Sequence, residues 1–255
     1  MEKIKLLGEV IIVDIGIRTD TGRIRENNQD AYYLPSEKSK PLFIIADGMG
    51  GHKAGEIASN LAIHIISQKF NDFLNRGNIN KNNIKNNIVE SFNEANDKIY
   101  KKASKEEDCS GMGTTVVLAY ISDENLYIGH VGDSRAYSLY EDKLLQITED
   151  HSLVEELIKN GSISKEEAKT HPQRNIITRA VGTSKDIDVD ILVLPKDTIE
   201  ILLLCTDGLT SMLDDNEIKD ILLKGESMQV ACDELIRCSN EKGGYDNITV
   251  LALEF

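Results

Sequence analysis

The sequence lacks the features that would divide the chain or anchor it in a membrane. Its 255 residues include four prolines and no linker rich in proline, glycine or serine, so we expect a single domain over 1–255. No apolar run approaches the ~18 residues of a membrane-spanning helix. The short apolar stretch 10–13 has no small-residue cleavage pattern after it. We therefore expect a cytoplasmic protein that does not act at a membrane.

The chain also lacks an excess of positive charge and paired cysteines. Lysine and arginine number 29 against 43 aspartates and glutamates, a net charge of −14, which is unfavourable for binding nucleic acid. The four cysteines form no C-x-x-C pair, which argues against a structural zinc site. A hydrophobic content of 40% with 28% charged residues is typical of a globular protein and too apolar for a disordered one.

Two long amphipathic segments and several short apolar runs are present. Apolar residues recur every three or four positions in 84–100, which predicts a helix, and a second helix is expected over 54–73. The intervening segment 75–83 is rich in asparagine and is expected to be a loop. Expected strands cover 41–46, 114–120, 125–131, 135–140, 143–147, 191–194, 199–205 and 248–253. Because strands and helices do not alternate, we expect an α+β fold with antiparallel sheets.

Turn and cap residues mark the ends of several further elements. Glu141 and Asp142 are expected to turn a hairpin, and Gly161 is placed to end a helix over 153–160. Ser164 and Asp214 each precede a glutamate by three residues, the spacing of a capping box. The second half of the chain is therefore expected to contain short, well-delimited helices.

Four aspartates stand at the ends of expected strands. Asp47, Asp133, Asp207 and Asp246 each neighbour a glycine or an asparagine, and one such pair by itself is typical of a turn. Carboxylates at strand ends can, however, converge at the rim of a core, where they repel one another unless a cation neutralises them. A site built only from oxygen ligands favours Mg²⁺ or Mn²⁺ over zinc or copper.

Two other segments could bind phosphate. The glycine-rich segment 47–56 leads from a strand into a helix, but it has neither common nucleotide-loop pattern, so a nucleotide site is the weaker hypothesis. Arg23 and Arg25 precede Asp30, and arginine binds phosphate through two parallel hydrogen bonds. An exposed surface charge is the ordinary alternative for either arginine.

Eight short motifs follow one another over roughly 17–255. They are Arg25-x-x-Asn28-x-Asp30, Asp47-Gly48-Met49-Gly50-Gly51-His52, Gly111-Met112-Gly113-Thr114-Thr115, Gly129-His130-Val131-Gly132-Asp133-Ser134-Arg135, Asp150-His151-Ser152, Asn175-Ile176-Ile177-Thr178-Arg179-Ala180-Val181-Gly182, Thr206-Asp207-Gly208 and Asp246-Asn247-Ile248-Thr249. Each motif is weak alone. In this order the set resembles the bacterial branch of the metal-dependent (type 2C) Ser/Thr protein phosphatase family.

The resemblance implies a fold and a metal site. The fold would be two stacked antiparallel β-sheets flanked by helix pairs, an α-β-β-α sandwich. By motif position, Asp47 would bridge two metal ions and Gly48 would bind through its backbone carbonyl. Asp207 and Asp246 would supply further metal-ligating carboxylates. The metal would be Mn²⁺ or Mg²⁺, as two ions or three.

Further residues receive roles from the same resemblance. Asp133 would bind a third, weaker ion, and Asp30 would reach the metals through water. Arg25 would bind the substrate phosphate. His52 is the candidate acid for the leaving group, although relatives from animals and plants carry their histidine directly after the Asp-Gly pair. Residues 153–179 would form a flap near the active site, and 1–14 a short N-terminal extension.

The resemblance also implies a reaction and partners. A hydroxide bridging the metal ions would attack the phosphorus of phosphoserine or phosphothreonine in a protein, without a covalent intermediate. The enzyme, a phosphoric monoester hydrolase in signalling, would counteract a bacterial Ser/Thr kinase, as a monomer that does not bind nucleic acid. Two alternatives stay open: a regulator dedicated to one phosphorylated partner, and a degenerate module that only binds.

Overall fold

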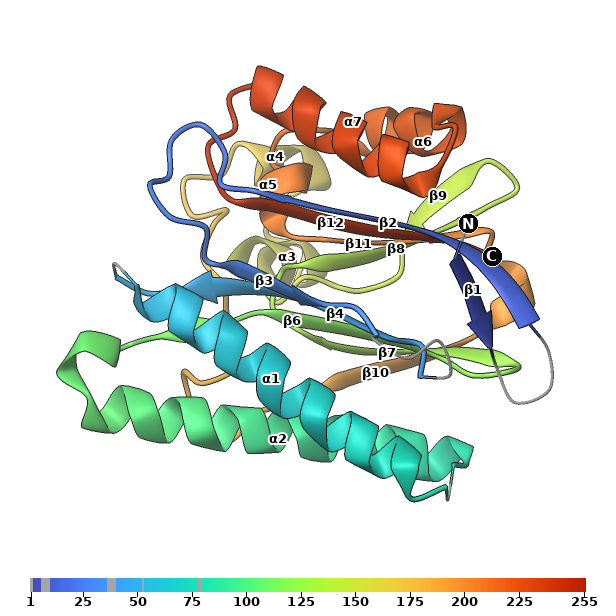
Figure 1. Ribbon diagram of the computed structural model, residues 1–255. Helices are drawn as coiled ribbons and strands as arrows, with labels where there is room; N and C mark the ends of the chain where they lie inside the picture. Colours follow the sequence, from blue (N-terminus) through green and yellow to red (C-terminus); the bar gives the residue numbers. More distant parts are fainter. Residues whose placement is uncertain (1, 6–9, 36–39, 52, 78) are drawn as a thin grey trace.

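The computed structural model describes residues 2–5, 10–35, 40–51, 53–77 and 79–255. Within them, two antiparallel sheets stack face to face, and helix pairs cover the outer face of each sheet (Figure 1). The expected α+β sandwich is confirmed. His52, the candidate acid, lies outside the described residues.

The first sheet contains both ends of the chain. Its strand order is β1-β2-β12-β11-β8-β9, and helices α6 and α7 lie on its outer face (Figure 1). The bounds are β1 Glu2–Lys5, β2 Val10–Asp20, β8 Arg135–Tyr140, β9 Lys143–Gln146, β11 Ile201–Cys205, β12 Ile248–Glu254, α6 Asp215–Lys224 and α7 Met228–Glu241.

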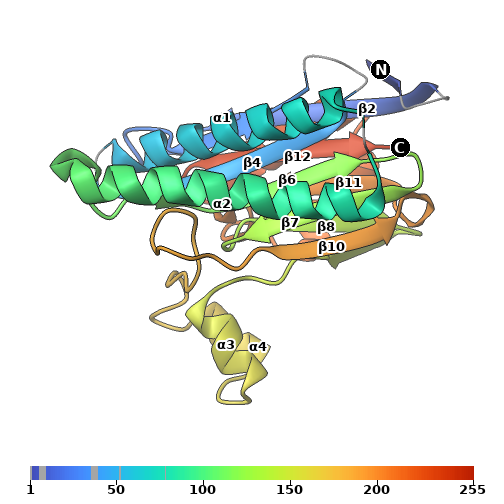
Figure 2. The same ribbon diagram turned by 90° about the horizontal axis from the view of Figure 1, so that it is seen from below.

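The second sheet has the order β10-β7-β6-β4-β3, and β5 pairs with β4. The long helices α1 and α2 lie side by side on its outer face (Figures 1 and 2). The bounds are β3 Asp30–Tyr33, β4 Leu42–Met49, β5 Gly113–Thr114, β6 Val116–Ile121, β7 Asn125–Val131, β10 Asp190–Pro195, α1 Ala54–Asn75 and α2 Lys81–Lys105. The remaining elements are α3 Leu153–Lys159, α4 Lys165–Lys169, α5 Asp207–Thr210 and the 3₁₀ turns Glu107–Cys109 and Lys196–Thr198.

The continuous apolar runs of the central strands reflect burial on both faces. Along β4, Ile44 packs toward α1 and α2, whereas Phe43 and Ile45 pack between the two sheets. In β11, Leu203 faces α6 and α7, whereas Leu202 and Leu204 face the other sheet. Because alternate side chains enter different apolar layers, the strand needs no polar face.

Local signals in the sequence agree with the structure at several element ends. Glu141 and Asp142 have φ of 47° and 60°, as a tight hairpin turn requires, and Gly161 has φ of 75° after α3. Ser164 and Asp214 both form complete capping boxes. These predictions are confirmed because each depends on neighbours in sequence alone.

Three elements differ from the expectation. Helix α2 begins at Lys81, within the segment expected to be a loop, because Asn80 caps it by accepting hydrogen bonds from two backbone N–H groups. Strands β2 and β3 were not expected. β2 pairs with β12 along Asp14 to Asp20, and β3 pairs with β4, so distant partners rather than local pattern define them. Residues 1–14 include β1 and the start of β2.

Helices α3 and α4 stand apart from the sandwich (Figure 2). No side chain of α3 is buried, and the only buried residue of α4 is Ala168. Backbone hydrogen bonds from Leu153 to Ile176 and from Thr178 to His151 close the base of this excursion. Among the residues that the structure describes, no helix has the length and apolar character needed to cross a bilayer.

Candidate metal centre

Strand pairing gathers the expected carboxylates at one end of the sandwich. Asp30 and Asp47 are directly opposite each other in the β3–β4 ladder. In the first sheet, Asp207 follows β11, and Asp246 precedes β12, which pairs antiparallel with β11. Residues far apart in the sequence therefore meet because the ends of four strands meet.

The carboxyl groups influence one another's ionisation. Burial raises the pKa of Asp47 well above its usual range, and the charges of Asp30 and Asp207 raise it further. Burial and the Asp246 charge raise the pKa of Asp207 to about 6, partly offset by a hydrogen bond with Asp47. These carboxyl groups repel one another and would be stabilised by a cation between them.

Three buried oxygen atoms support the fit to a hard cation. The Oδ1 atoms of Asp30, Asp133 and Asp207 have no hydrogen-bond partner among the described residues. A buried carboxylate oxygen without a donor is costly. Oxygen atoms of this kind are the ligands that Mg²⁺ and Mn²⁺ prefer, so the donor set fits such an ion.

Two threonines hold the buried Asp30. Its Oδ2 accepts hydrogen bonds from the Thr206 hydroxyl at 3.0 Å and the Thr249 hydroxyl at 2.7 Å. Burial nevertheless raises the pKa of Asp30 to about 7. Their supporting role was missed from sequence, although both residues stand in the quoted motifs beside Asp207 and Asp246. The only signal in the sequence is that Thr206 directly precedes Asp207 and that Thr249 follows Asp246 by three residues.

Glycines set the position of the β4 end against helix α1. A Cβ at Gly48 would lie 2.1 Å from the carbonyl oxygen of Gly55, and a Cβ at Gly55 would lie 2.6 Å from that of Gly48. The Gly48 N–H donates to the Gln29 carbonyl at 3.1 Å. The glycine-rich segment therefore lets the backbone that follows Asp47 pack tightly against the first turn of the helix.

Arg25 lies beside the carboxylates at the rim. Its Nη2 donates to Asp246 Oδ2 at 2.8 Å, and its side chain is 53% exposed. This hydrogen bond, with the nearby charges of Asp47 and Asp207, raises the pKa of Arg25. An exposed guanidinium next to a cation site can contact both the solvent and a bound anion.

Asn247 ties the loop that carries Arg25 to the start of β12. Its side-chain amide donates to the carbonyls of Thr21 and Asn27, at 2.9 and 3.0 Å, and its Oδ1 accepts from the Gln29 N–H at 2.8 Å. Asn247 belongs to the last of the eight sequence motifs, but the motif by itself does not indicate this structural role. Its function depends on contacts with residues more than 200 positions away.

Asp133 lies at the edge of the same cluster, in the turn between β7 and β8. It is 9% exposed. Burial, with the charges of Asp207 and Asp150, raises its pKa to about 8. Arg135 holds Asp150 through a two-pronged ion pair, with Nη2 at 2.7 Å from Oδ2. The sequence-predicted aspartates at 30, 47, 133, 207 and 246 thus all belong to one electrostatic cluster.

Clustered carboxylates and an arginine at one end of an antiparallel sandwich suit a metal-dependent hydrolase that binds an anionic group. The chain matches the family model described as Protein phosphatase 2C over residues 22–250. It belongs to the protein phosphatase 2C family and is a protein-serine/threonine phosphatase.

Individual relatives are similar to this chain in sequence and structure over nearly its whole length. The serine/threonine phosphatase stp of Listeria welshimeri is 42% identical over 238 residues, which cover 93% of this chain and 94% of that protein. The crystal structure of the serine/threonine phosphatase Stp1 from Staphylococcus aureus superposes with a TM-score of 0.89 at 35% identity, covering 96% of each chain. The catalytic domain of the phosphatase PstP, solved in complex with two manganese ions, has a TM-score of 0.81 at 30% identity and covers 95% of this chain and 97% of its own.

Proposed function

We propose that this chain hydrolyses phosphoserine and phosphothreonine in proteins with divalent cations held by Asp47, Asp207, Asp246 and the Gly48 carbonyl. Asp30 would act on the same ions through water. The observation that carries this proposal is the meeting of carboxylates from four strand ends, with buried oxygen atoms that have no donor. Either Mn²⁺ or Mg²⁺ suits such ligands.

The chain's own residues would bind and orient the phosphate. When bound, the cations lower the pKa of a water molecule and offset the charge of the transferring group. Arg25 would donate to the phosphate oxygens, because its guanidinium is half exposed while Asp246 holds it beside the cluster. This arrangement places positive charge where negative charge develops during the displacement.

Three further roles complete the proposal. His52 would protonate the leaving alkoxide of the serine or threonine. Asp133 would bind a third, weaker ion, for which its position near Asp207 is suitable. Residues 153–179, which stand apart from the sandwich, would form a flap that influences the choice of substrate (Figure 2).

The proposed setting is bacterial signalling. The substrates would be cytoplasmic proteins phosphorylated by a cognate Ser/Thr kinase, and the enzyme would act as a single-domain monomer. Phosphoproteome comparison of cells with and without the phosphatase would test the substrates, since sites of one kinase should gain phosphate when the phosphatase is absent.

Hydrolysis of p-nitrophenyl phosphate and of a phosphothreonine peptide tests the proposed chemistry. We expect activity with Mn²⁺, loss of activity with EDTA, and a loss of about 100-fold or more in Asp207→Asn, because an amide is a poorer ligand than a carboxylate. Asp220→Asn, on the exposed side of α6, is the matched control and should retain full activity. Turnover that persists without metal would overturn the proposal.

A further inference from the structure

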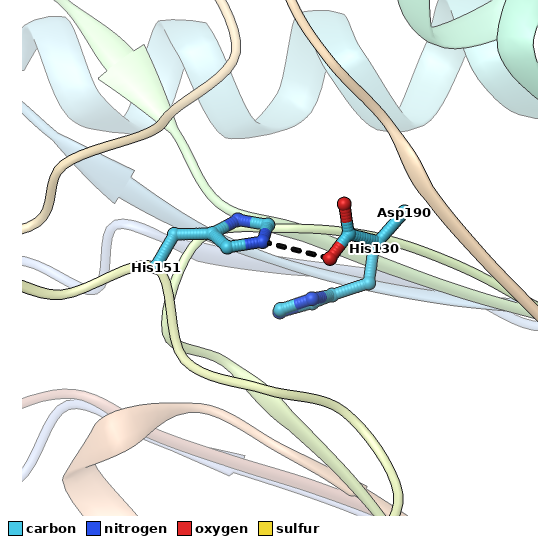
Figure 3. Close-up of side chains that lie close together, drawn as sticks. All are labelled: His130, His151 and Asp190. Atoms are coloured by element: carbon cyan, nitrogen blue, oxygen red, sulfur yellow. Dashed lines mark hydrogen bonds and ion pairs between the residues drawn. The ribbon is translucent and has the colours of Figure 1, made fainter. Parts of the chain in front are cut away.

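His130 and His151 form a buried stacked pair next to the metal centre. Their ring centroids are 4.7 Å apart with an interplanar angle of 33°, and the side chains are 0% and 6% exposed. His130 comes from β7 and His151 from the segment after β9, and Asp190 at the start of β10 lies beside them (Figure 3). The ring nitrogens and the Asp190 carboxylate are close enough together to raise the question of another cation site.

Hydrogen bonds decide which ring atoms carry protons. Nδ1 of His151 accepts from the Gly132 N–H at 3.0 Å, so its Nε2 carries the proton and donates to Asp190 Oδ2 at 3.1 Å. Nε2 of His130 donates to the Ser134 carbonyl at 3.0 Å. Burial lowers the pKa of both rings, that of His130 to about 3, so both are neutral. His151 then has no lone pair to offer a cation. We therefore interpret His130, His151 and Asp190 as a hydrogen-bonded cluster rather than a metal site.

The two rings hold the residues on either side of Asp133. His151 contacts Gly132 twice, through its ring and through its backbone N–H, which donates to the Gly132 carbonyl at 2.8 Å. His130 holds Ser134, whose hydroxyl also bonds the Thr115 hydroxyl at 2.7 Å. Gly132 has φ of 115°, and a Cβ there would lie 2.5 Å from the Thr115 side chain. The turn that carries Asp133 is therefore fixed at both neighbours.

The same histidine reaches the base of the excursion 153–179. The His151 carbonyl accepts from the Thr178 N–H at 2.8 Å, and Asp190 also binds Arg179 through Oδ1 at 2.8 Å. A cavity of about 140 Å³ lies beside these contacts, lined by α3 residues such as Glu155 and by His151, Arg179 and Asp190. Helix α3 beside this cavity has no buried side chain, and its Lys159 forms an ion pair with Glu149.

We propose that His130 and His151 are positioning residues that fix the Asp133 carboxylate for a weakly bound cation and connect it to the base of the excursion 153–179. The inference rests on the proposed role of Asp133 as a metal ligand. Neither histidine would touch the cation or the substrate. Their effect would be on the affinity of one cation site, because a turn already held in place loses less conformational freedom when its carboxylate binds a cation.

Calorimetric titration of the metal-free protein, residues 1–255, with Mn²⁺ tests this inference. The His151→Gln side chain places its amide near the former Nε2, so it can still reach Asp190 but not the Gly132 N–H. The His151→Asn side chain places its amide oxygen near the former Nδ1, so it can still accept from the Gly132 N–H. We expect His151→Gln to weaken the weakest Mn²⁺ site about tenfold and to leave the tighter sites unchanged. His151→Asn should retain most of the wild-type affinity. Equal affinities of His151→Gln and the wild type at the weakest site would overturn the inference.

A variant of His130 and two controls distinguish a failure of the positioning role from a failure of the proposed role of Asp133. His130→Phe keeps the stacked ring but cannot donate to Ser134, and it too should weaken only the weakest site. His64→Gln, exposed on α1, should change nothing. Asp133→Asn should abolish the weakest site. If it does not, the proposed role of Asp133 fails. If it does and either His151→Gln or His130→Phe binds Mn²⁺ like the wild type, the positioning role fails. A general loss of folding would lower the affinity of every site and the thermal midpoint together, which also contradicts a selective role.

Discussion

Asp30, Asp133 and Asp207 are aspartates whose surroundings make ionisation unfavourable. Their pKa values are raised to about 7, 8 and 6, chiefly by burial and then by neighbouring carboxylates. Asp30 keeps this raised value even though two hydroxyls donate to it. Without cations, the folded chain therefore holds protons that the unfolded chain would release at the same pH.

This proton uptake predicts that the metal-free protein becomes more stable as the pH falls from 8.5 to 7.0. In that window the unfolded chain has ionised aspartates with pKa near 4, whereas the folded chain gains protons, so the free energy of unfolding rises by about 1–2 kcal/mol. Below about pH 6.5, the buried neutral histidines 130 and 151 act in the opposite direction, because unfolding lets them take up protons. Urea unfolding in EDTA at the two pH values measures the difference.

Asp133→Asn should remove most of this pH dependence, because the Asp133 carboxyl, with its pKa of about 8, takes up most of the protons gained between pH 8.5 and 7.0. Asp30→Asn replaces a carboxyl with a pKa of about 7 and should remove a smaller part. Its amide oxygen can still accept from Thr206 and Thr249, but it cannot take up a proton. A wild-type urea midpoint that falls between pH 8.5 and 7.0 would contradict the expectation.

At the scale of elements, the contact between β4 and α1 positions the central part of the site. Asp47 and Gly48 lie among the last three residues of β4, and α1 begins at Ala54, five residues after the strand ends at Met49, so the short connection must fold back closely. Gly48 and Gly55 make this approach possible because each faces the backbone of the other. A displacement of α1 would therefore move the segment that carries Asp47.

Gly55→Ala should destabilise the fold by about 1–3 kcal/mol and reduce activity. Its new Cβ would lie 2.6 Å from the Gly48 carbonyl oxygen, a backbone atom that can move only if the strand end moves, and this clash outweighs the gain in helix propensity. Gly51→Ala is the matched control in the same loop, since a Cβ there meets nothing within 4 Å. Urea midpoints and Mn²⁺-dependent phosphatase rates check the pair. Equal midpoints for the two variants would show that the tight contact is unimportant.

For the whole molecule, the candidate metal centre joins the two layers of the sandwich. Asp30 and Asp47 belong to the second sheet, Asp207 and Asp246 adjoin the first, and Asp133 lies in the turn that passes from one to the other. Repulsion among these groups opposes the packing of the sheets at this end, and cations would reverse it. The free energy of cation binding is then directly coupled to the stability of the sandwich.

Saturating Mn²⁺ should accordingly raise the thermal midpoint. At a free concentration 100 times the dissociation constant, the stabilisation is about 2.7 kcal/mol, or roughly 5–10 °C for a chain of this size. Asp207→Asn should lose most of this shift, yet its metal-free form should melt above the metal-free wild type, because one buried carboxylate has been removed. Scanning calorimetry with and without Mn²⁺ measures both effects, and a metal-free variant that melts below the wild type would refute the repulsion argument.

The sequence by itself determined the features that depend on neighbouring residues. The helical periodicity of 84–100, the capping boxes at Ser164 and Asp214 and the turn at Glu141 all arise from local geometry. The ordered motifs also sufficed to indicate the family, because many short matches in one order are jointly specific.

Only the tertiary structure decided the features that depend on pairing between distant segments. Strand β2 exists through its ladder with β12, and the support of Asp30 by Thr206 and Thr249 arises where separate strands meet. The roles of His130 and His151 likewise appear only once their rings stack beside Gly132 and Asp190. The physical reason is that hydrogen bonds and charge repulsion act through space over a few ångströms, whereas a sequence pattern records only separation along the chain.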